Sequence, residues 1–126
     1  MNETLWYYAD TKHMAAIIRK RLIFELKGEI VWLTSNPQYH LVNAGTQYRI
    51  QVTTDAVLGS YNVLKLAGRT ELVDHIERSN PEQWFGTRQL EFDDKKTPME
   101  ALTSEGWVRI DGPRKQYLIN MPLDEP

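Results

Sequence analysis

The first forty residues constrain the fold most, because they read as a strand, a helix and a second strand in direct succession. Residues 5–10 form an aromatic run that ends in an aspartate, a residue type favoured at helix N-caps. Apolar residues then recur at helical spacing, which predicts a helix over residues 11–21. Residues 30–33 are continuously apolar, typical of a strand buried on both faces, and the Asn-Pro pair at 36–37 ends that strand. If the two strands are neighbours, aromatic and hydroxyl side chains lie close together.

The remainder of the chain contains more predicted strands than helices, without regular alternation. This pattern predicts a single α+β domain over residues 1–126, with a twisted, mixed or antiparallel sheet, two main helices and a frayed tail at 122–126. Residues 63–66 fit either a short strand or the start of a helix. The other expected elements are strands at 48–52, 88–92, 107–110 and 116–121, the last two as a hairpin, and helices at 71–79 and 98–102.

Composition removes several classes of site and partner. The chain has 126 residues, which suits one domain, and no cysteine, which removes disulfides, thiolate metal sites and cysteine nucleophiles. Its net charge of −2, from 15 basic and 17 acidic residues, gives no overall attraction to nucleic acid. No secretory signal is visible and no apolar stretch approaches ~18 residues, so we expect a cytoplasmic protein without a membrane span.

Common catalytic and metal-binding motifs are also missing from the sequence. The three histidines, His13, His40 and His75, lack the spacing of a zinc motif, so we expect them to face solvent and predict no metal site. The sequence contains neither a P-loop nor the glycine motif of dinucleotide-binding folds, and it has no Gly-x-Ser-x-Gly nucleophile elbow.

The order of segments in the first third of the chain resembles small ADP-ribosyltransferase-like proteins. The resemblance rests on a first strand, Leu-Trp-Tyr-Tyr-Ala-Asp at 5–10, then a helix with Arg-Leu-Ile at 21–23, then Val-Trp-Leu-Thr-Ser-Asn-Pro at 31–37. Tyr-Arg-Ile at 48–50 and Trp-Phe-Gly-Thr at 84–87 are similar to later family segments. The resemblance implies that NAD is bound as a substrate and that ADP-ribose passes to a protein or nucleic acid acceptor.

The resemblance also implies roles for individual residues. Tyr7 occupies the position where the family has a histidine that contacts the NAD ribose, and Ser35 lies in the segment at the nicotinamide end. Arg49 would pair with the pyrophosphate, because a guanidinium binds phosphate through two parallel hydrogen bonds. Glu91 is the first choice for the carboxylate that stabilises the cationic, oxocarbenium-like sugar, and Glu82 is the second.

Two other interpretations remain open. Taken one by one, these aromatic and polar residues also fit the core and rim of an ordinary sheet. The same aromatic surface could instead serve a non-catalytic interaction module that binds a protein partner or single-stranded nucleic acid by stacking.

Overall fold

The computed structural model describes residues 3–25, 30–39, 45–93 and 95–120. Within these ranges a mostly antiparallel sheet is combined with four α-helices, so the predicted α+β class is confirmed. The strands are β1 (Glu3–Asp10), β2 (Leu22–Ile23), β3 (Val31–Thr34), β4 (Gln47–Thr54), β5 (Val57–Ser60), β6 (Trp84–Thr87), β7 (Leu90–Glu91), β8 (Met99–Thr103) and β9 (Gly106–Arg109). The helices are α1 (Thr11–Lys20), α2 (Tyr61–Leu66), α3 (Asp74–Glu77) and α4 (Gly112–Asn120), with a 3-10 turn at Pro81–Gln83.

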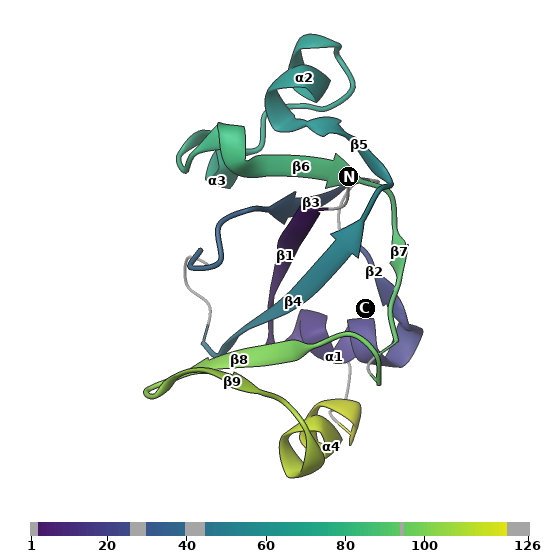
Figure 1. Cartoon of the computed structure of the whole chain (residues 1–126), viewed down its shortest axis with the longest axis vertical. Coiled ribbons are helices and arrows are strands. Elements are labelled where there is room, and N and C mark those ends of the chain that lie inside the picture. Colours follow the sequence, from purple (N-terminus) through teal and green to yellow (C-terminus); the bar gives the residue numbers. More distant parts are fainter. Residues whose placement is uncertain (1–2, 26–29, 40–44, 94, 121–126) are drawn as a thin grey trace.

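The main sheet has seven strands in the order β5-β6-β3-β1-β4-β8-β9, and every neighbouring pair is antiparallel. In Figure 1 β6 and β8 run across the view, whereas β1 and β4 run obliquely between them, so strand direction changes within the sheet. The two opening strands are neighbours, as expected, but β1 and β3 share a single pair, Trp6 with Thr34. By contrast, β1 and β4 are paired over eight residues.

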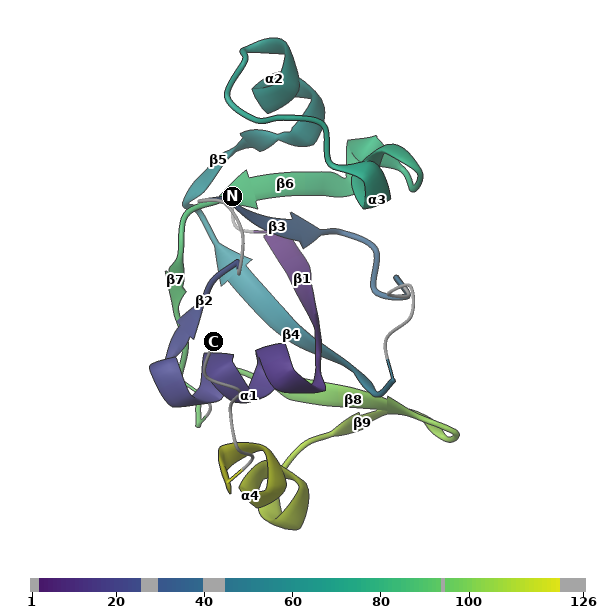
Figure 2. The same cartoon turned by 180° about the vertical axis from the view of Figure 1, so that it is seen from behind.

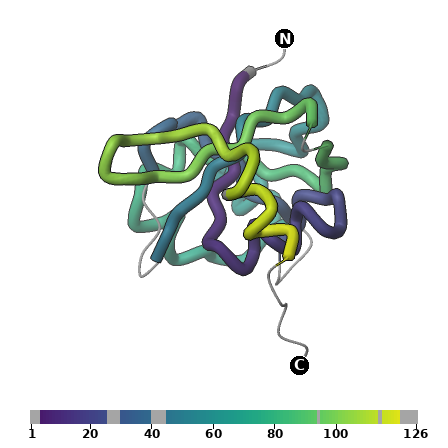
Figure 3. The backbone as a smooth tube through the Cα atoms, turned by 90° about the horizontal axis from the view of Figure 1, so that it is seen from below, coloured from purple at the N-terminus to yellow at the C-terminus, as the bar shows by residue number. Residues whose placement is uncertain are grey.

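Two hydrophobic cores cover opposite faces of the sheet. The larger core packs α1 and α4 against β1, β4 and β8. In Figure 2, the view turned by 180°, α1 lies nearer the viewer than the sheet. The smaller core lies under α2 and α3, around Trp32, Tyr61 and Trp84. The hairpin of β8 and β9 extends to one side of the molecule (Figure 3). Strand residues alternate between the two faces, so neighbouring residues such as Tyr7 and Tyr8 have different surroundings.

The helix predicted over residues 11–21 is confirmed as α1 (Thr11–Lys20). Asp10 caps this helix, since its side chain accepts a hydrogen bond of 2.9 Å from the main-chain N–H of His13. Arg21 closes the helix in the left-handed conformation, with φ of 56°. Local sequence signals were therefore sufficient to predict this helix.

Three other predicted elements are wrong. The helix expected at 98–102 is β8, in which Met99 and Ala101 alternate into the larger core. Of the strand expected at 116–121, residues 116–120 belong instead to α4 and residue 121 lies outside the described residues. The hairpin partner of β9 is β8. The helix expected over 71–79 is reduced to the four residues of α3, and 61–66 form a helix of their own.

Candidate functional site

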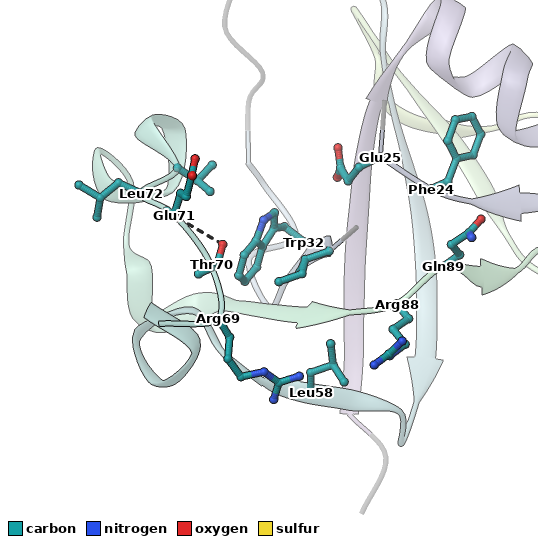
Figure 4. Close-up of a pocket in the computed structure, with 12 residues that line it drawn as sticks. Phe24, Glu25, Trp32, Leu58, Arg69, Thr70, Glu71, Leu72, Arg88 and Gln89 are labelled. Atoms are coloured by element: carbon teal, nitrogen blue, oxygen red, sulfur yellow. Dashed lines mark hydrogen bonds between the residues drawn. The ribbon is translucent and has the colours of Figure 1, made fainter. Parts of the chain in front are cut away.

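A large cleft opens beside β6, between the small β2–β7 ribbon and the segment that joins α2 to α3 (Figure 4). Its volume is about 1040 Å³. This is just above the range of about 300–1,000 Å³ that is typical of ligand pockets. We call it the outer cleft. Apolar and aromatic side chains form much of its lining, together with two arginines, Arg69 and Arg88, and two glutamates, Glu25 and Glu71.

Several chain segments that are distant in sequence build the outer cleft. Phe24 and Glu25 directly follow β2, Trp32 lies on β3, and Arg88 follows β6. Gly86 pairs with Trp32 across the β3–β6 ladder. A Cβ atom at Gly86 would lie 3.0 Å from Cζ3 of Trp32, so the absence of a side chain there lets the indole lie against the strand.

Arg69 and Arg88 are the principal cationic groups of the outer cleft. In the close-up their guanidinium groups point toward each other across Leu58 (Figure 4). Neither guanidinium makes an ion pair or a side-chain hydrogen bond with any residue that the structure describes. Two unpaired guanidinium groups that converge in a cleft form an electropositive site suited to phosphate oxygens.

A second, smaller cavity adjoins the outer cleft at Glu25 and Trp32, which line both spaces. This inner cavity has a volume of about 200 Å³. It lies where β1 and β3 separate beyond their single pair, and Tyr7 and Tyr8 line it from β1. A small hollow therefore lies between the two opening strands, at the end of β1.

Glu25 lies in a hydrogen-bonded cluster at this junction. The Tyr7 hydroxyl donates to Oε1 of Glu25 at 3.0 Å, and Nε2 of His13 lies 2.7 Å from the main-chain oxygen of Phe24. This oxygen can only accept, so Nε2 of His13 carries the proton. Burial raises the pKa of the Glu25 carboxyl, although hydrogen bonds from Tyr7 and from the Trp32 main chain oppose the effect.

Burial also changes the pKa of the two other titratable groups in this cluster, Tyr7 and His13. It raises the pKa of the Tyr7 hydroxyl, which the nearby Glu25 carboxylate raises further, and it lowers the pKa of His13. Tyr7 therefore stays a hydrogen-bond donor and His13 is neutral at neutral pH. A carboxyl with a raised pKa beside a cleft is a frequent property of functional sites.

We expect the Glu25→Gln variant to gain stability relative to the parent protein as the pH rises. A raised folded-state pKa means that Glu25 contributes its full stability below the ordinary carboxyl pKa, and that this contribution is lost as the pH rises through the folded-state value. Glutamine carries no charge and can still accept from Tyr7, so the variant avoids the loss. Each pKa unit between folded and unfolded states corresponds to about 1.4 kcal/mol.

Melting temperatures measured from about pH 4 to pH 8 test this expectation, since they span the ordinary carboxyl pKa. His13 acts in the opposite direction: its lowered pKa contributes stability above the ordinary histidine value, which is lost on acidification. Both proteins contain His13, so its effect cancels in the difference between them. A difference in melting temperature that is constant across the pH range would show that Glu25 has no raised pKa.

The structure does not bring together the four residues that the resemblance selects. Tyr7 is buried in the larger core and lines the inner cavity, whereas Arg49 pairs with Tyr8 in the β1–β4 ladder and therefore lies on the opposite face. Ser35 is exposed after β3, and its main-chain N–H donates to Gln83 at 3.0 Å. Glu91 is exposed on β7, two residues beyond Gln89, which does line the outer cleft.

Arg49 is already engaged by other groups. Its guanidinium carbon lies 4.2 Å from the ring centre of Trp6 and 4.3 Å from that of Trp107. Its Nε donates to Glu100 at 2.8 Å, and Nη1 donates to the main-chain oxygen of Pro37. These contacts explain how a charged side chain is held on the sheet with little exposure. They leave Arg49 outside both cavities.

Other predicted residues also differ from expectation. Glu82, the second choice for the carboxylate, is exposed on the 3-10 turn. His13 does not face solvent, because it is half-buried against Phe24. His75 is exposed, as expected, and packs edge-on against Trp84. His40 lies outside the described residues. In the described ranges, no group of three or more histidine, aspartate or glutamate side chains could hold a metal ion.

Sequence reasoning missed the three charged residues that distinguish the outer cleft, Glu25, Arg69 and Arg88. One local signal was present for Glu25, a single carboxyl within the apolar run at 22–26. Arg69 and Arg88 are separated in the chain and belong to no motif, so only the folded arrangement identifies them.

Searches against protein-family models, curated proteins and solved structures found no match to this chain. Among the helices in the described residues, none has the length and apolar character needed to cross a membrane.

Proposed function

We propose that the chain binds NAD in the outer cleft and transfers ADP-ribose to a protein or nucleic acid acceptor, with nicotinamide as the leaving group. The observation that carries this proposal is the convergence of Arg69 and Arg88, unpaired among the described residues, in a cleft of about 1040 Å³. A pyrophosphate carries two negative charges, and two guanidinium groups can each donate to it in pairs. The resemblance over residues 5–37 supports the same ligand independently.

The cleft supplies further groups that this chemistry needs. Trp32 and Phe24 offer aromatic surface for a planar ring. Breaking the bond to nicotinamide creates an oxocarbenium-like sugar, and we assign Glu25 as the carboxylate that stabilises its positive charge. A bound cation favours the ionised form of a carboxyl and so opposes the effect of burial on the Glu25 pKa. Tyr7, placed at the ribose by the resemblance, donates to that same carboxyl.

The assignment of Glu25 can be tested against Glu91, which stays a prediction of the resemblance. We expect the parent protein, incubated with NAD labelled in its adenylate part and with protein or single-stranded DNA or RNA acceptors, to release nicotinamide and label one acceptor. Glu25→Gln should reduce nicotinamide release by at least about 100-fold, the usual scale for loss of one transition-state electrostatic contact. Glu91→Gln is a matched control, because Glu91 is exposed and lines neither cavity.

Each outcome of this experiment is informative. Loss of turnover in Glu91→Gln but not in Glu25→Gln would return the catalytic role to Glu91. No nicotinamide release under any condition would contradict the transferase proposal. If the protein then binds unmodified oligonucleotide with an affinity that falls steeply as salt is added, the non-catalytic module is favoured. The half-exposed Trp6 and Trp107 beside Arg49 provide a stacking surface for such a module.

A further inference from the structure

Aromatic rings dominate the walls of the inner cavity. Tyr39 is the central ring: its centre lies 5.6 Å from that of Tyr8 and 5.0 Å from that of Trp84, and the Trp84 ring is perpendicular to it. His75 packs against Trp84 at 5.4 Å, and Trp32 adds an indole from β3. The described residues therefore surround a small space with several π systems of different orientation.

The formal charge in this lining is negative. Asp10 and Glu25 contribute carboxyl groups, whereas no lysine or arginine is among the described residues that line the cavity. The two histidines in the lining are held neutral, because burial lowers the pKa of both His13 and His75, and nearby Arg78 lowers that of His75 further. Burial raises the pKa of Tyr8 and of Tyr39, which therefore stay uncharged.

We propose that the inner cavity is a binding site for a compact organic cation, such as a quaternary ammonium or pyridinium group. A cation is attracted to the negative faces of aromatic rings, and the attraction grows when both are removed from water. The Asp10 carboxylate adds direct charge complementarity, and a bound cation favours the ionised form of Glu25. The volume of about 200 Å³ limits the occupant to a head group rather than a whole cofactor.

Such a cation has two possible sources that the same chemistry would recognise. It could be the quaternary ammonium of a separate small molecule, or the pyridinium end of a dinucleotide whose phosphates lie in the outer cleft. The cation site does not depend on the transfer activity proposed above, because neither Arg69 nor Arg88 lines the inner cavity. Small cations that are too short to reach those arginines therefore test it separately.

Two pairs of probes differ mainly in charge. Choline is compared with 3,3-dimethylbutan-1-ol, its neutral isostere, and 1-methylnicotinamide with nicotinamide, each titrated by calorimetry or by NMR. We expect one or both cations to bind roughly tenfold more tightly than the neutral partner, the scale of a desolvated cation–π contact. Preference for choline would assign a quaternary ammonium, and preference for 1-methylnicotinamide a pyridinium. Equal affinity within both pairs, or no binding of either cation, would overturn the proposal.

Two variants locate the bound cation. Tyr39→Leu removes the central ring, yet the hydrogen bonds of residue 39 to Tyr8 and Gln47 use its main chain and should persist. Asp10→Asn removes a negative charge but keeps a good N-cap for α1. Each should weaken cation binding by about fivefold or more. Tyr117→Leu is the matched control, since this tyrosine is exposed on α4 away from the cavity. Unchanged affinity in both cavity variants would place the cation elsewhere.

Discussion

Replacing Arg69 and Arg88 together by alanine is expected to weaken the binding of ADP-ribose at least about 100-fold, because each charge-assisted hydrogen bond contributes about 1.5–3 kcal/mol. The two guanidinium groups line the outer cleft and have no other partner among the described residues. Isothermal titration at one fixed salt concentration measures the effect. ADP-ribose is the preferred probe because it retains the pyrophosphate and lacks the nicotinamide.

The folded state should be little affected by this double substitution. Both arginines are exposed, and surface changes of this kind alter stability by about 0.5 kcal/mol or less. Arg109→Ala is the matched control: Arg109 is an exposed arginine on β9 that lines neither cavity. Lysine at 69 and 88 should restore part of the affinity, since it supplies charge without the planar pair of donors. If the alanine double variant and Arg109→Ala bind ADP-ribose equally well, phosphate recognition by these arginines is refuted.

Gly86→Ala is expected to destabilise the protein by about 2–3 kcal/mol, at the upper end of the usual cost of overpacking. The added Cβ would lie 2.7 Å from Leu64 Cδ1, 2.8 Å from Ile30 Cγ2 and 3.0 Å from Trp32 Cζ3. Leu64 and Trp32 belong to the smaller core, so neither side chain can move freely. Thermal unfolding should show a melting temperature lower by roughly 8 °C or more.

Gly45→Ala is the control for this substitution, because a Cβ at Gly45 would meet no atom of the described residues within 4 Å. Ile30 and Trp32 also line the outer cleft, so displacement of either should change ligand affinity as well as stability. Equal melting temperatures for the two alanine variants would mean that the smaller core is loosely packed around β6.

The parts of the fold that follow local rules could be predicted from the sequence. The helix after Asp10 combines a cap, an apolar stripe and a left-handed end, and all three are set within one short segment. At β8 and α4 the local preference and the tertiary environment disagree. Residues 98–102 contain good helix formers, yet Met99 and Ala101 fill the larger core from a strand. Residues 116–121 were expected as the returning strand of a hairpin, yet 116–120 belong to α4. Among the described side chains of that helix Leu118 is buried and Tyr117 is exposed.

The candidate site was less predictable, because it depends on which face of a strand each residue occupies. Tyr7 and Arg49 lie on strands that are directly paired, but Arg49 is opposite Tyr8, the residue after Tyr7. The two side chains therefore lie on opposite faces of the sheet. Arg69 and Arg88 converge only because α2, α3 and β6 pack together. No local sequence pattern predicts such a convergence. A single carboxyl within an apolar run, as at Glu25, is a signal that can be found in the sequence.

The single pair between β1 and β3 divides the main-chain ladder into two well-bonded halves, β5-β6-β3 and β1-β4-β8-β9. The larger core continues across this seam, but hydrogen bonding along it nearly stops. The inner cavity lies at the seam and takes lining from both halves, Tyr8 from one and Trp84 from the other. An occupant would therefore act as a bridge between them, and its removal would leave side-chain packing alone to fix the angle at which they meet.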